Sequence, residues 1–485
     1  MKRLLPVLAV SLALQLLAAA LPDTRADLLA YRQWTRSLVA RGLVASYWPD
    51  PGSRAESPHE HPPIDYPPVF PYLLWLLGHA LSALDPTLLV SGGGRLDFLI
   101  RVPLVLANGA IGLALFVALV RRAGVDVARV VAALFLLNPA VIFDTAYWGQ
   151  ADSLCALFVV AGLAVALDHP EWGCVALAAG AFVKPFAYAF VPFALVAAVK
   201  RRGWRRGGTA LLAATAAWGA LLVPFAVAGR LRDILGALWG QIDAMPYASV
   251  NAHNLWWILG KGVPWVPASQ RVLGPLTYEA LGLLLFGAFA FGTLVGLHHS
   301  KDNQALPVAA ASVAFALFVL ATHMHENHLF LFLPLVLLAR GEEGRWRRFF
   351  LAVSAVALLN MVLHDPFLMS RIDVHAPGPR VRLPPQLEPA PGFADYLRGH
   401  GYPEVAEEMT GDSSALRLVL TLVNSQACIL LFAYWVRGAV LFRGSRGAET
   451  QEVGRLPAWG FAAIVLFLVA TAVPFVAKLA RAAGG

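Results

Sequence analysis

The chain has 485 residues, of which 58% are hydrophobic and only 14% are charged, and its formal net charge is +8. Because soluble domains carry about 25% charged residues, this composition excludes a soluble enzyme, a disordered protein and a disulfide scaffold. The three cysteines, Cys155, Cys174 and Cys428, stand in apolar runs as small buried hydrophobes. The basic residues lack interleaved aromatics, which excludes a nucleic-acid partner. A multi-pass protein of the lipid bilayer with positive cytoplasmic loops is expected.

The chain opens with the basic pair Lys2-Arg3, followed by an apolar run over 4–21. A cleaved signal peptide is one interpretation, because small residues stand at 18–20. We prefer an uncleaved first span with a cytoplasmic N-terminus, since the apolar run is long and further spans follow it.

Further apolar runs of near span length predict an all-α, polytopic protein of about 11–14 transmembrane helices. The runs lie near 100–120, 127–143, 153–168, 171–183, 185–199, 208–228, 277–298, 305–321, 328–340, 347–363, 413–437 and 457–478. We expect two regions. A catalytic membrane module covers 1–340 and includes a large first external loop, 22–99, that carries juxtamembrane helices. A C-terminal membrane region covers 341–485 and includes the external loop 364–412.

The apolar segment 68–84 decides the predicted topology. Counted as a span, it would place three basic clusters outside the cell. An interfacial or re-entrant helix places all three in the cytoplasm, as the positive-inside rule favours. The clusters are Arg121-Arg122, the run 200–206 and the group 345–348. We therefore expect an interfacial helix, which Tyr72, Trp75 and His79 suit.

On this topology the polar stretches gather on the non-cytoplasmic face. They are 22–99, 144–152, 229–276 and 364–412. The last contains Arg371, Arg380 and Arg382 among many prolines, and it suits either a lid over a lipid-facing cleft or a plain linker. Lys478 and Arg481 of the C-terminal tail also fall outside, against the positive-inside rule, so the side of the C-terminus stays open.

Two aspartates mark the first external loop. Asp27 stands just past the first span, where a carboxylate near a low-dielectric surface can act as a base with a tuned pKa. The alternative is the N-cap of an amphipathic helix over 28–40. Asp65, followed by Tyr66-Pro67-Pro68, either belongs to the same site or caps the interfacial helix, since proline suits a first helical turn.

The second external turn, 138–153, places acids, aromatics and a glutamine at the end of an apolar span. Aromatic rings beside hydrogen-bonding groups are a common way to hold a sugar. An aromatic belt with capping acids is the alternative. The candidate residues are Asp144, Tyr147, Trp148, Gln150 and Asp152.

Lys184, which precedes Pro185, lies inside an otherwise apolar stretch. A lysine at membrane depth is costly and is by default a functional hypothesis. Snorkelling of its side chain to the external interface is the alternative.

A histidine-rich stretch, 322–328, closes another span on the external side. His325 and His328 can share a helix face, but His323 and Glu326 need not join them, so the spacing is poor for a metal. A protonatable histidine beside a glutamate can instead bind an anionic head group such as a phosphate. A plain interfacial histidine cluster is the alternative.

In order and rough spacing, these motifs resemble the GT-C superfamily of polytopic glycosyltransferases over about residues 23–340. The nearest relatives are the dolichyl-phosphate-glucose glucosyltransferases of the asparagine-linked glycan pathway and their prokaryotic relatives. That family carries, in chain order, an Asp shortly before a Trp, an Asp-Tyr-Pro-Pro, an Asn-Pro with an acidic-aromatic-Gln turn, a Lys-Pro and a His-Glu. In the same order, the matching positions are Asp27 with Trp34 for the first motif and 65–68 for the second. Residues 138–139 with 144–150 match the third, 184–185 the fourth and 325–326 the fifth.

The resemblance implies an inverting transfer of a hexose or pentose from a polyprenyl-phosphate donor to an acceptor hydroxyl. The acceptor is a glycan, a lipid or a protein, and family members often work without a metal or other cofactor. Asp27 would be the general base. His325, Glu326, His328 and Lys184 would contact the donor phosphate or lipid. The remaining candidates would bind the sugar or acceptor or support the site: Asp65, Tyr66, Asp144, Tyr147, Trp148, Gln150 and Asp152.

The chain departs from the family after the His-Glu pair, where Asn327 replaces a lysine or arginine, and its last third matches only in being apolar. Two other functions remain as alternatives. One is a transporter or flippase of a lipid-linked or polar substrate, although paired broken helices are not evident. The other is a surface-polysaccharide polymerase or ligase. The simple loops suggest a prokaryotic plasma membrane.

Overall fold

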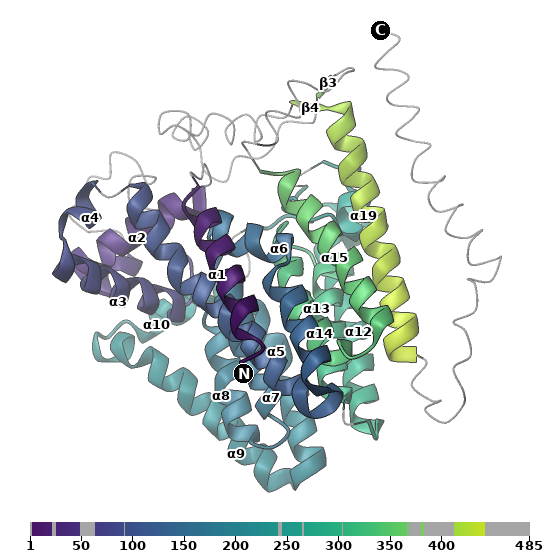
Figure 1. The fold of residues 1–485 in the computed structure, drawn as a ribbon. Helices are drawn as coiled ribbons and strands as arrows, with labels where there is room; N and C mark the ends of the chain where they lie inside the picture. The colour runs from purple at the N-terminus through teal and green to yellow at the C-terminus, as the bar shows by residue number, and fades with distance from the viewer. Residues whose placement is uncertain are drawn as a thin grey trace.

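The computed structural model describes residues 2–21, 26–48, 64–91, 93–240, 245–263, 266–302, 304–365, 368, 380–382 and 412–441. Over these residues the protein is mostly helical (Figure 1), which confirms the expected class of all-α membrane protein. The helices are α1 (Leu5–Ala19), α2 (Ala26–Arg41), α3 (Val69–Leu84), α4 (Thr87–Ser91), α5 (Gly94–Leu136), α6 (Pro139–Ile142), α7 (Asp152–Val165), α8 (Pro170–Ala181), α9 (Val191–Val227), α10 (Leu231–Gly240), α11 (Leu255–Leu259), α12 (Tyr278–His299), α13 (Ala305–Leu320), α14 (Phe332–Arg340), α15 (Gly344–Val362) and α19 (Ala415–Trp435).

Shorter segments complete the described chain. The 3₁₀ and π segments are η1 (Ala45–Tyr47), η2 (Phe143–Trp148), η3 (Pro185–Phe190), η5 (His328–Leu331) and η6 (Val436–Leu441). Strands β1 (Arg271–Leu273) and β2 (Leu276–Thr277) form one antiparallel pair, and β3 (Arg380–Arg382) and β4 (Asp412–Ser414) form another.

Four helices in the described part of the chain are long and apolar enough to cross a membrane. They cover Gly94–Leu136, Pro185–Val227, Tyr278–His299 and Ala415–Gly438, and shorter apolar helices accompany them. These helices follow the apolar runs read from the sequence as far as 413–437. The last run, 457–478, lies outside the described residues, as do Arg371, Lys478, Arg481 and most of the loop 364–412.

Two of the long helices are helical hairpins. Gly124 breaks α5 with a φ of 81° and a ψ of 167°, a conformation that only glycine adopts readily. Gly112 and Leu136, equally distant from Gly124 on either side, pack together, so the two arms run antiparallel. Gly203 breaks α9 in the same way, with a φ of 82° and a ψ of 170°. The separate apolar runs expected at 100–120 and 127–143, and at 185–199 and 208–228, are the arms of these hairpins.

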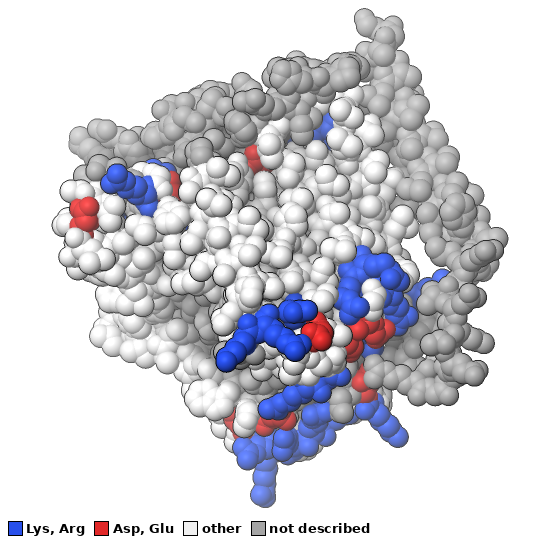
Figure 2. Space-filling view, viewed as in Figure 1, with Lys and Arg blue, Asp and Glu red and all other residues white. Residues whose placement is uncertain are grey.

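The three basic clusters lie at one end of the helix bundle. The Arg122 guanidinium donates to the carbonyl of Leu338 at 2.7 Å, and the Lys200 ammonium donates to the carbonyl of Leu297 at 3.0 Å. These bonds join the turns of α5 and α9 to the ends of α14 and α12. Figure 2 shows the resulting concentration of basic side chains over the lower end of the molecule. The clusters therefore share one face, as the predicted topology requires.

Helices α2, α3 and α4 lie beside the bundle rather than within it (Figure 1). Helix α3 packs closely on α2, because a Cβ built on Gly78 would lie 2.7 Å from the Val39 side chain. The first residue of α3, Val69, donates its backbone N–H to the carbonyl of Phe182 at 3.0 Å. After α3 the chain returns to α2, where Arg32 pairs with Asp97. Both ends of α3 thus lie near the same end of the bundle, and an interfacial or re-entrant placement of α3 stays a prediction.

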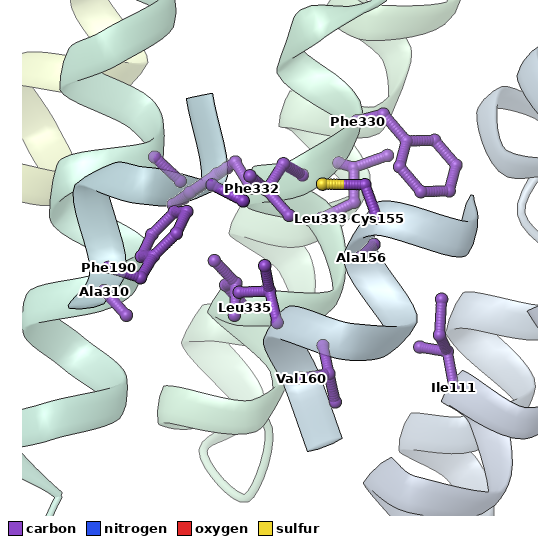
Figure 3. Packing of buried hydrophobic residues seen from close by; sticks show 14 of the residues in the cluster. Ile111, Cys155, Ala156, Val160, Phe190, Ala310, Phe330, Phe332, Leu333 and Leu335 are labelled. Atoms are coloured by element: carbon purple, nitrogen blue, oxygen red, sulfur yellow. The ribbon is translucent and has the colours of Figure 1, made fainter. Parts of the chain in front are cut away.

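Buried apolar side chains fill the spaces between the bundle helices. Figure 3 shows Cys155 and Val160 of α7 beside the aromatic and leucine side chains around Phe332. Phe332 stacks on Phe315 with ring centroids 4.4 Å apart. All three cysteines are buried free thiols, which confirms their reading as small hydrophobes. Since close-packed interiors are stiff, this core is a rigid support for the polar groups at the end opposite the basic clusters.

Candidate functional site

Most of the candidate residues meet in one polar network at the end of the bundle that lies opposite the basic clusters. They come from the start of α2, the loop before α3, the turn 143–152, the segment before η3 and the stretch 322–328. These segments are distant in sequence, and each one follows or precedes an apolar helix. Hydrogen bonds and ring contacts join them.

Asp27 and Trp148 form the first link in this network. Trp148 ends η2, and its indole Nε1 donates to Oδ2 of Asp27 at 2.8 Å. Asp27 lies in the first turn of α2, where the helix dipole favours a carboxylate. Because α2 starts at Ala26 and the Asp27 side chain bonds outside its own helix, the N-cap alternative is not supported. The half-buried carboxylate is oriented by Trp148 and remains accessible to solvent.

Tyr66 is the second link. Its hydroxyl accepts a hydrogen bond from the hydroxyl of Tyr31 at 3.0 Å and donates to Oε1 of Gln150 at 3.4 Å. Its ring lies 5.6 Å from that of Trp34, and its carbonyl accepts from the Tyr47 hydroxyl at 2.9 Å. The Asp-Tyr-Pro-Pro motif is therefore anchored to α2 on one side and to the turn 143–152 on the other.

Lys184 is the third link, and its ammonium group is the main positive charge of the network. Its ammonium lies 2.9 Å from Oδ1 of Asp152 and donates to Oε1 of Gln150 at 3.2 Å. Both charged side chains are almost fully buried, with 6% of Lys184 and 2% of Asp152 exposed. Asn327 donates its amide to the other oxygen of Asp152. This arrangement contradicts the snorkelling alternative, because Lys184 pairs inside the protein.

The histidine stretch closes the site beside Lys184. The His325 and His328 rings lie 5.0 Å apart, and the His328 ring lies 5.0 Å from that of Phe186, which follows Lys184. The backbone N–H of His325 donates to Nδ1 of His328 at 3.2 Å. Within the described ranges, no group of three or more His, Cys, Asp or Glu residues is arranged to hold a metal ion. Metal independence stays a prediction.

Burial changes the charge state expected of His325. Desolvation, reinforced by the Lys184 charge, lowers the pKa of His325 to about 3, so the ring is neutral at pH 7. A neutral imidazole donates one hydrogen bond but brings no positive charge. His325 therefore offers a phosphate a neutral hydrogen-bond donor rather than the protonated histidine that the sequence suggested.

The carboxyl group of Asp65 has a pKa close to neutral pH. Part of its side chain reaches solvent, but the protein packed around it removes much of its hydration. This desolvation, followed by repulsion from Asp27, raises the pKa of Asp65 to about 7. The charge of Asp27 also acts on Asp152, and that of buried Asp144 acts on Lys184. The site is thus rich in carboxylates that share one lysine.

Tyr147 and Glu326 complete the set of candidates. Tyr147 is half-buried and packs on Phe143, with ring centroids 4.9 Å apart. Glu326 is buried, with 8% of its surface exposed. They lie in η2 and in the stretch 322–328, two of the segments that form the site.

The sequence did not single out a second polar cluster that supports the site. His253 Nε2 lies 3.0 Å from His364 Nε2, and the backbone N–H of His253 donates to Asn360 at 2.9 Å. The Asn360 amide donates to the carbonyl of Asn251, which pairs with the backbone of His325. Polar residues inside apolar runs were the available signal, and Asn360 is such a residue.

Comparison with known proteins adds no assignment, because neither a protein-family model nor a curated protein matches the chain.

Proposed function

We propose that this protein is a membrane-embedded inverting glycosyltransferase of the GT-C type. It moves a sugar from a polyprenyl-phosphate donor to an acceptor hydroxyl on the non-cytoplasmic face. One observation supports the proposal most: motifs that are far apart in sequence, and that the resemblance ranks as functional, lie in two hydrogen-bonded chains that meet at the turn 148–150. The network runs from Asp27 through Trp148, and from Tyr66 through Gln150 and Lys184 to Asp152.

In the proposed reaction, Asp27 removes the proton of the acceptor hydroxyl as the hydroxyl oxygen attacks the anomeric carbon of the donor. A new carbon–oxygen bond forms, and the bond from that carbon to the phosphate oxygen breaks. The lipid phosphate leaves with the bonding electrons, and the configuration inverts. A positioned base of this kind contributes about 10²–10⁴-fold to a rate. The Trp148 N–H supports this role by fixing one oxygen of Asp27.

The leaving phosphate needs hydrogen-bond donors or cations. In the proposal, His325 and His328 supply donors beside Lys184, whose charge is already balanced by Asp152. Lys184 thus acts mainly by holding Asp152 and Gln150 in place. Lys184 is then not an independent cation that binds the phosphate. The other partner of Asp152 is the neutral amide of Asn327 rather than a second cation, which fits this role.

The proposed sidedness rests on charge. The basic clusters gather at the bundle end opposite the Asp27 network, and basic loops remain on the cytoplasmic side of a membrane. The active face would then be non-cytoplasmic, with the N-terminus inside. In the proposal, each arm of the two hairpins is a separate span, and the shorter apolar helices add further spans to the four long helices.

The direct test uses the purified protein in lipid nanodiscs with a panel of synthetic polyprenyl-phosphate sugars, and it measures sugar release or transfer. We expect one donor to turn over, and Asp27→Asn to lower the rate by about 10²–10⁴-fold with unchanged thermal stability. The matched control is Asp126→Asn, because Asp126 is an exposed carboxylate that pairs with Arg3 at the basic end.

The same samples separate the alternatives. Full activity in Asp27→Asn would dismiss Asp27 as the base. Movement of an intact labelled donor across proteoliposomes, without cleavage of its sugar–phosphate bond, would favour the transporter or flippase. Turnover of a lipid-diphosphate donor alone would favour a polymerase or ligase.

A further inference from the structure

The α9 turn, residues 200–207, is a basic and aromatic surface that the proposed reaction does not use. It joins the two apolar arms of α9, and Gly203 breaks the helix within it. Trp204 in this turn is 83% exposed, although tryptophan side chains are usually buried for the most part. Helix α9 reaches the lowest part of the molecule in Figure 1, and basic side chains project from that part in Figure 2. The turn therefore combines an exposed indole ring with positive charge.

The tripeptide Trp-Arg-Arg occurs twice in the basic clusters, and its two copies are packed in opposite ways. Trp346 of the second copy is 1% exposed and packs on Trp435, with ring centroids 4.9 Å apart. Arg347, which follows it, donates to the carbonyl of Gly341 at 3.2 Å. The second copy is thus fixed by contacts within the protein, whereas the copy at 204–206 presents its tryptophan to the surroundings. Because the local sequence is the same, the difference lies in the packing.

The arginines of the α9 turn are held only weakly by the protein. Arg202 lies 3.9 Å from Asp168, and Arg206 lies 2.9 Å from Glu171, but both arginine side chains are exposed. Exposed ion pairs of this kind contribute little to stability. Arg205 is exposed as well, and it forms no ion pair within the described part of the chain. Three arginines thus stand beside two carboxylates, and the turn keeps a net positive charge.

The turn of α5, residues 121–126, is also basic but differs in both respects. Its Arg122 donates to the carbonyl of Leu338 at 2.7 Å and lies 3.5 Å from Glu342, so this arginine is held against α14 and the residues that follow it. The α5 turn contains no tryptophan. Of the three basic clusters, the α9 turn is therefore the one in which weakly held arginines and an exposed indole coincide.

The place of the α9 turn in the chain favours a lipid as its partner. With each arm of α9 a span, as proposed, the short turn lies at the membrane surface, at the level of the head groups. Tryptophan favours this level, because its ring is apolar and its N–H is polar. Arginine pairs with phosphate oxygens in a bidentate way. Leu211 and Leu212, which follow the turn on the second arm, are exposed, as contact with acyl chains requires.

We propose that the α9 turn binds the head group of an anionic membrane phospholipid, with its arginines around the phosphate and the Trp204 ring at the boundary between head group and acyl chains. A neutral phospholipid such as phosphatidylcholine fits less well, because its own cation offsets the charge of its phosphate. The bound lipid belongs to the surrounding membrane and is neither the donor nor the acceptor of the proposed reaction. The inference rests on the two arms of α9 being spans and not on glycosyl transfer.

The test measures the affinity of the full-length protein, in a neutral detergent, for fluorescent phosphatidylglycerol and for phosphatidylcholine with the same acyl chains. We expect phosphatidylglycerol to bind at least about tenfold more tightly, since each basic side chain near an anionic head group contributes about fivefold and several act together. Arg205→Glu replaces a positive charge with a negative one, so it should weaken binding of phosphatidylglycerol about tenfold or more. It should leave binding of phosphatidylcholine unchanged.

Two further variants sharpen the test. Arg348→Glu is the matched control, because Arg348 is an exposed arginine of the other Trp-Arg-Arg copy, and this variant should leave binding unchanged. Trp204→Ala should weaken binding of both lipids, since the ring contacts the chains as well as the head group. Its melting temperature should equal that of the wild type, because Trp204 is exposed. Equal losses in Arg205→Glu and Arg348→Glu would overturn the assignment to the α9 turn, as would equal affinity of the wild type for the two lipids.

Two soluble competitors test the choice of a lipid. Glycerol phosphate carries the charge of the head group without acyl chains, and hexaglutamate represents an acidic segment of a protein partner. We expect neither compound, in excess, to displace phosphatidylglycerol from the wild type. Displacement by glycerol phosphate would overturn the lipid in favour of a soluble phosphate. Displacement by hexaglutamate would overturn it in favour of an acidic protein.

Discussion

The indole Nε1 of Trp148 donates a 2.8 Å hydrogen bond to the carboxylate of Asp27, although the two residues stand in different motifs of the sequence. We predict that Trp148→Phe, which keeps an aromatic ring and removes this donor, lowers transferase activity about 10- to 100-fold, because small misplacements of a reacting group are costly. The loss of stability should be only about 1 kcal/mol, since solvent reaches Asp27.

A second tryptophan supplies the control for this prediction. The indole of Trp218 donates to the carbonyl of Ala178 at 3.1 Å, away from the Asp27 network. Trp218→Phe should therefore cost similar stability and leave the rate unchanged. Equal rate losses in the two variants would show that the Trp148 bond has no special role. Steady-state rates and thermal melts of both variants decide the matter.

The buried pair of Lys184 and Asp152 gives a stability prediction. Lys184→Met leaves Asp152 charged and buried, with its main counter-ion gone, and breaking such a pair costs about 3–5 kcal/mol. Adding Asp152→Asn removes the stranded charge, so the double variant should recover part of this loss. Denaturant unfolding of the wild type, the two single variants and the double variant measures the coupling. Additive losses would contradict a direct pair.

Asp65 makes stability depend on pH. The pKa of its carboxyl lies at about 7 in the folded protein, chiefly through desolvation, against 3.8 as the ordinary value. Between these values the unfolded chain has released a proton that the folded protein retains. Stability should therefore fall as the pH rises from about 4 to about 7, and this contribution should level off above that range.

Asp65→Asn removes this titration. We expect the melting temperature of the variant to fall less than that of the wild type as the pH rises from 5 to 8. Both are measured in one detergent at constant ionic strength. A parallel decline in the two proteins would place the pH dependence in another group. Since Asp27 is the second cause of the shift, Asp27→Asn should move the titration of Asp65 to lower pH.

The sequence predicted which segments share a face but not which atoms meet. Apolar run lengths and the basic clusters brought Asp27, Asp65 and His325 to one end, because each stands at the mouth of an apolar run. The bond from Trp148 to Asp27 depends on the tilt of α2 against η2, which no local pattern encodes. The resemblance singled out the family motifs, but Tyr31, which bonds Tyr66, belongs to none of them. The amphipathic pattern of the segment 28–40 gave no reason to select Tyr31 over its neighbours. The pairing of Lys184 with Asp152 likewise needed the fold.

Gly149 carries the last prediction, because it follows Trp148 in the chain and packs against Leu28, the neighbour of Asp27. Its φ of 86° disfavours any side chain, and an added methyl group would meet Leu28 at 2.9 Å. Gly149→Ala should cost about 1–2 kcal/mol from the backbone and about 1–3 kcal/mol more from overpacking. Gly229 is the matched control: it ends α9 with a left-handed φ of 71°, where Arg230 donates its backbone N–H to the carbonyl of Phe225, and nothing lies within 4 Å of an added Cβ.

Gly229→Ala should therefore show the backbone cost alone. The excess loss in Gly149→Ala measures the contact with Leu28, and since Leu28 follows Asp27 in the chain, that contact should displace the carboxylate. We expect the rate to fall in Gly149→Ala and to hold in Gly229→Ala, with both measured on the folded fraction. Equal losses of stability in the two variants would mean that Leu28 moves freely.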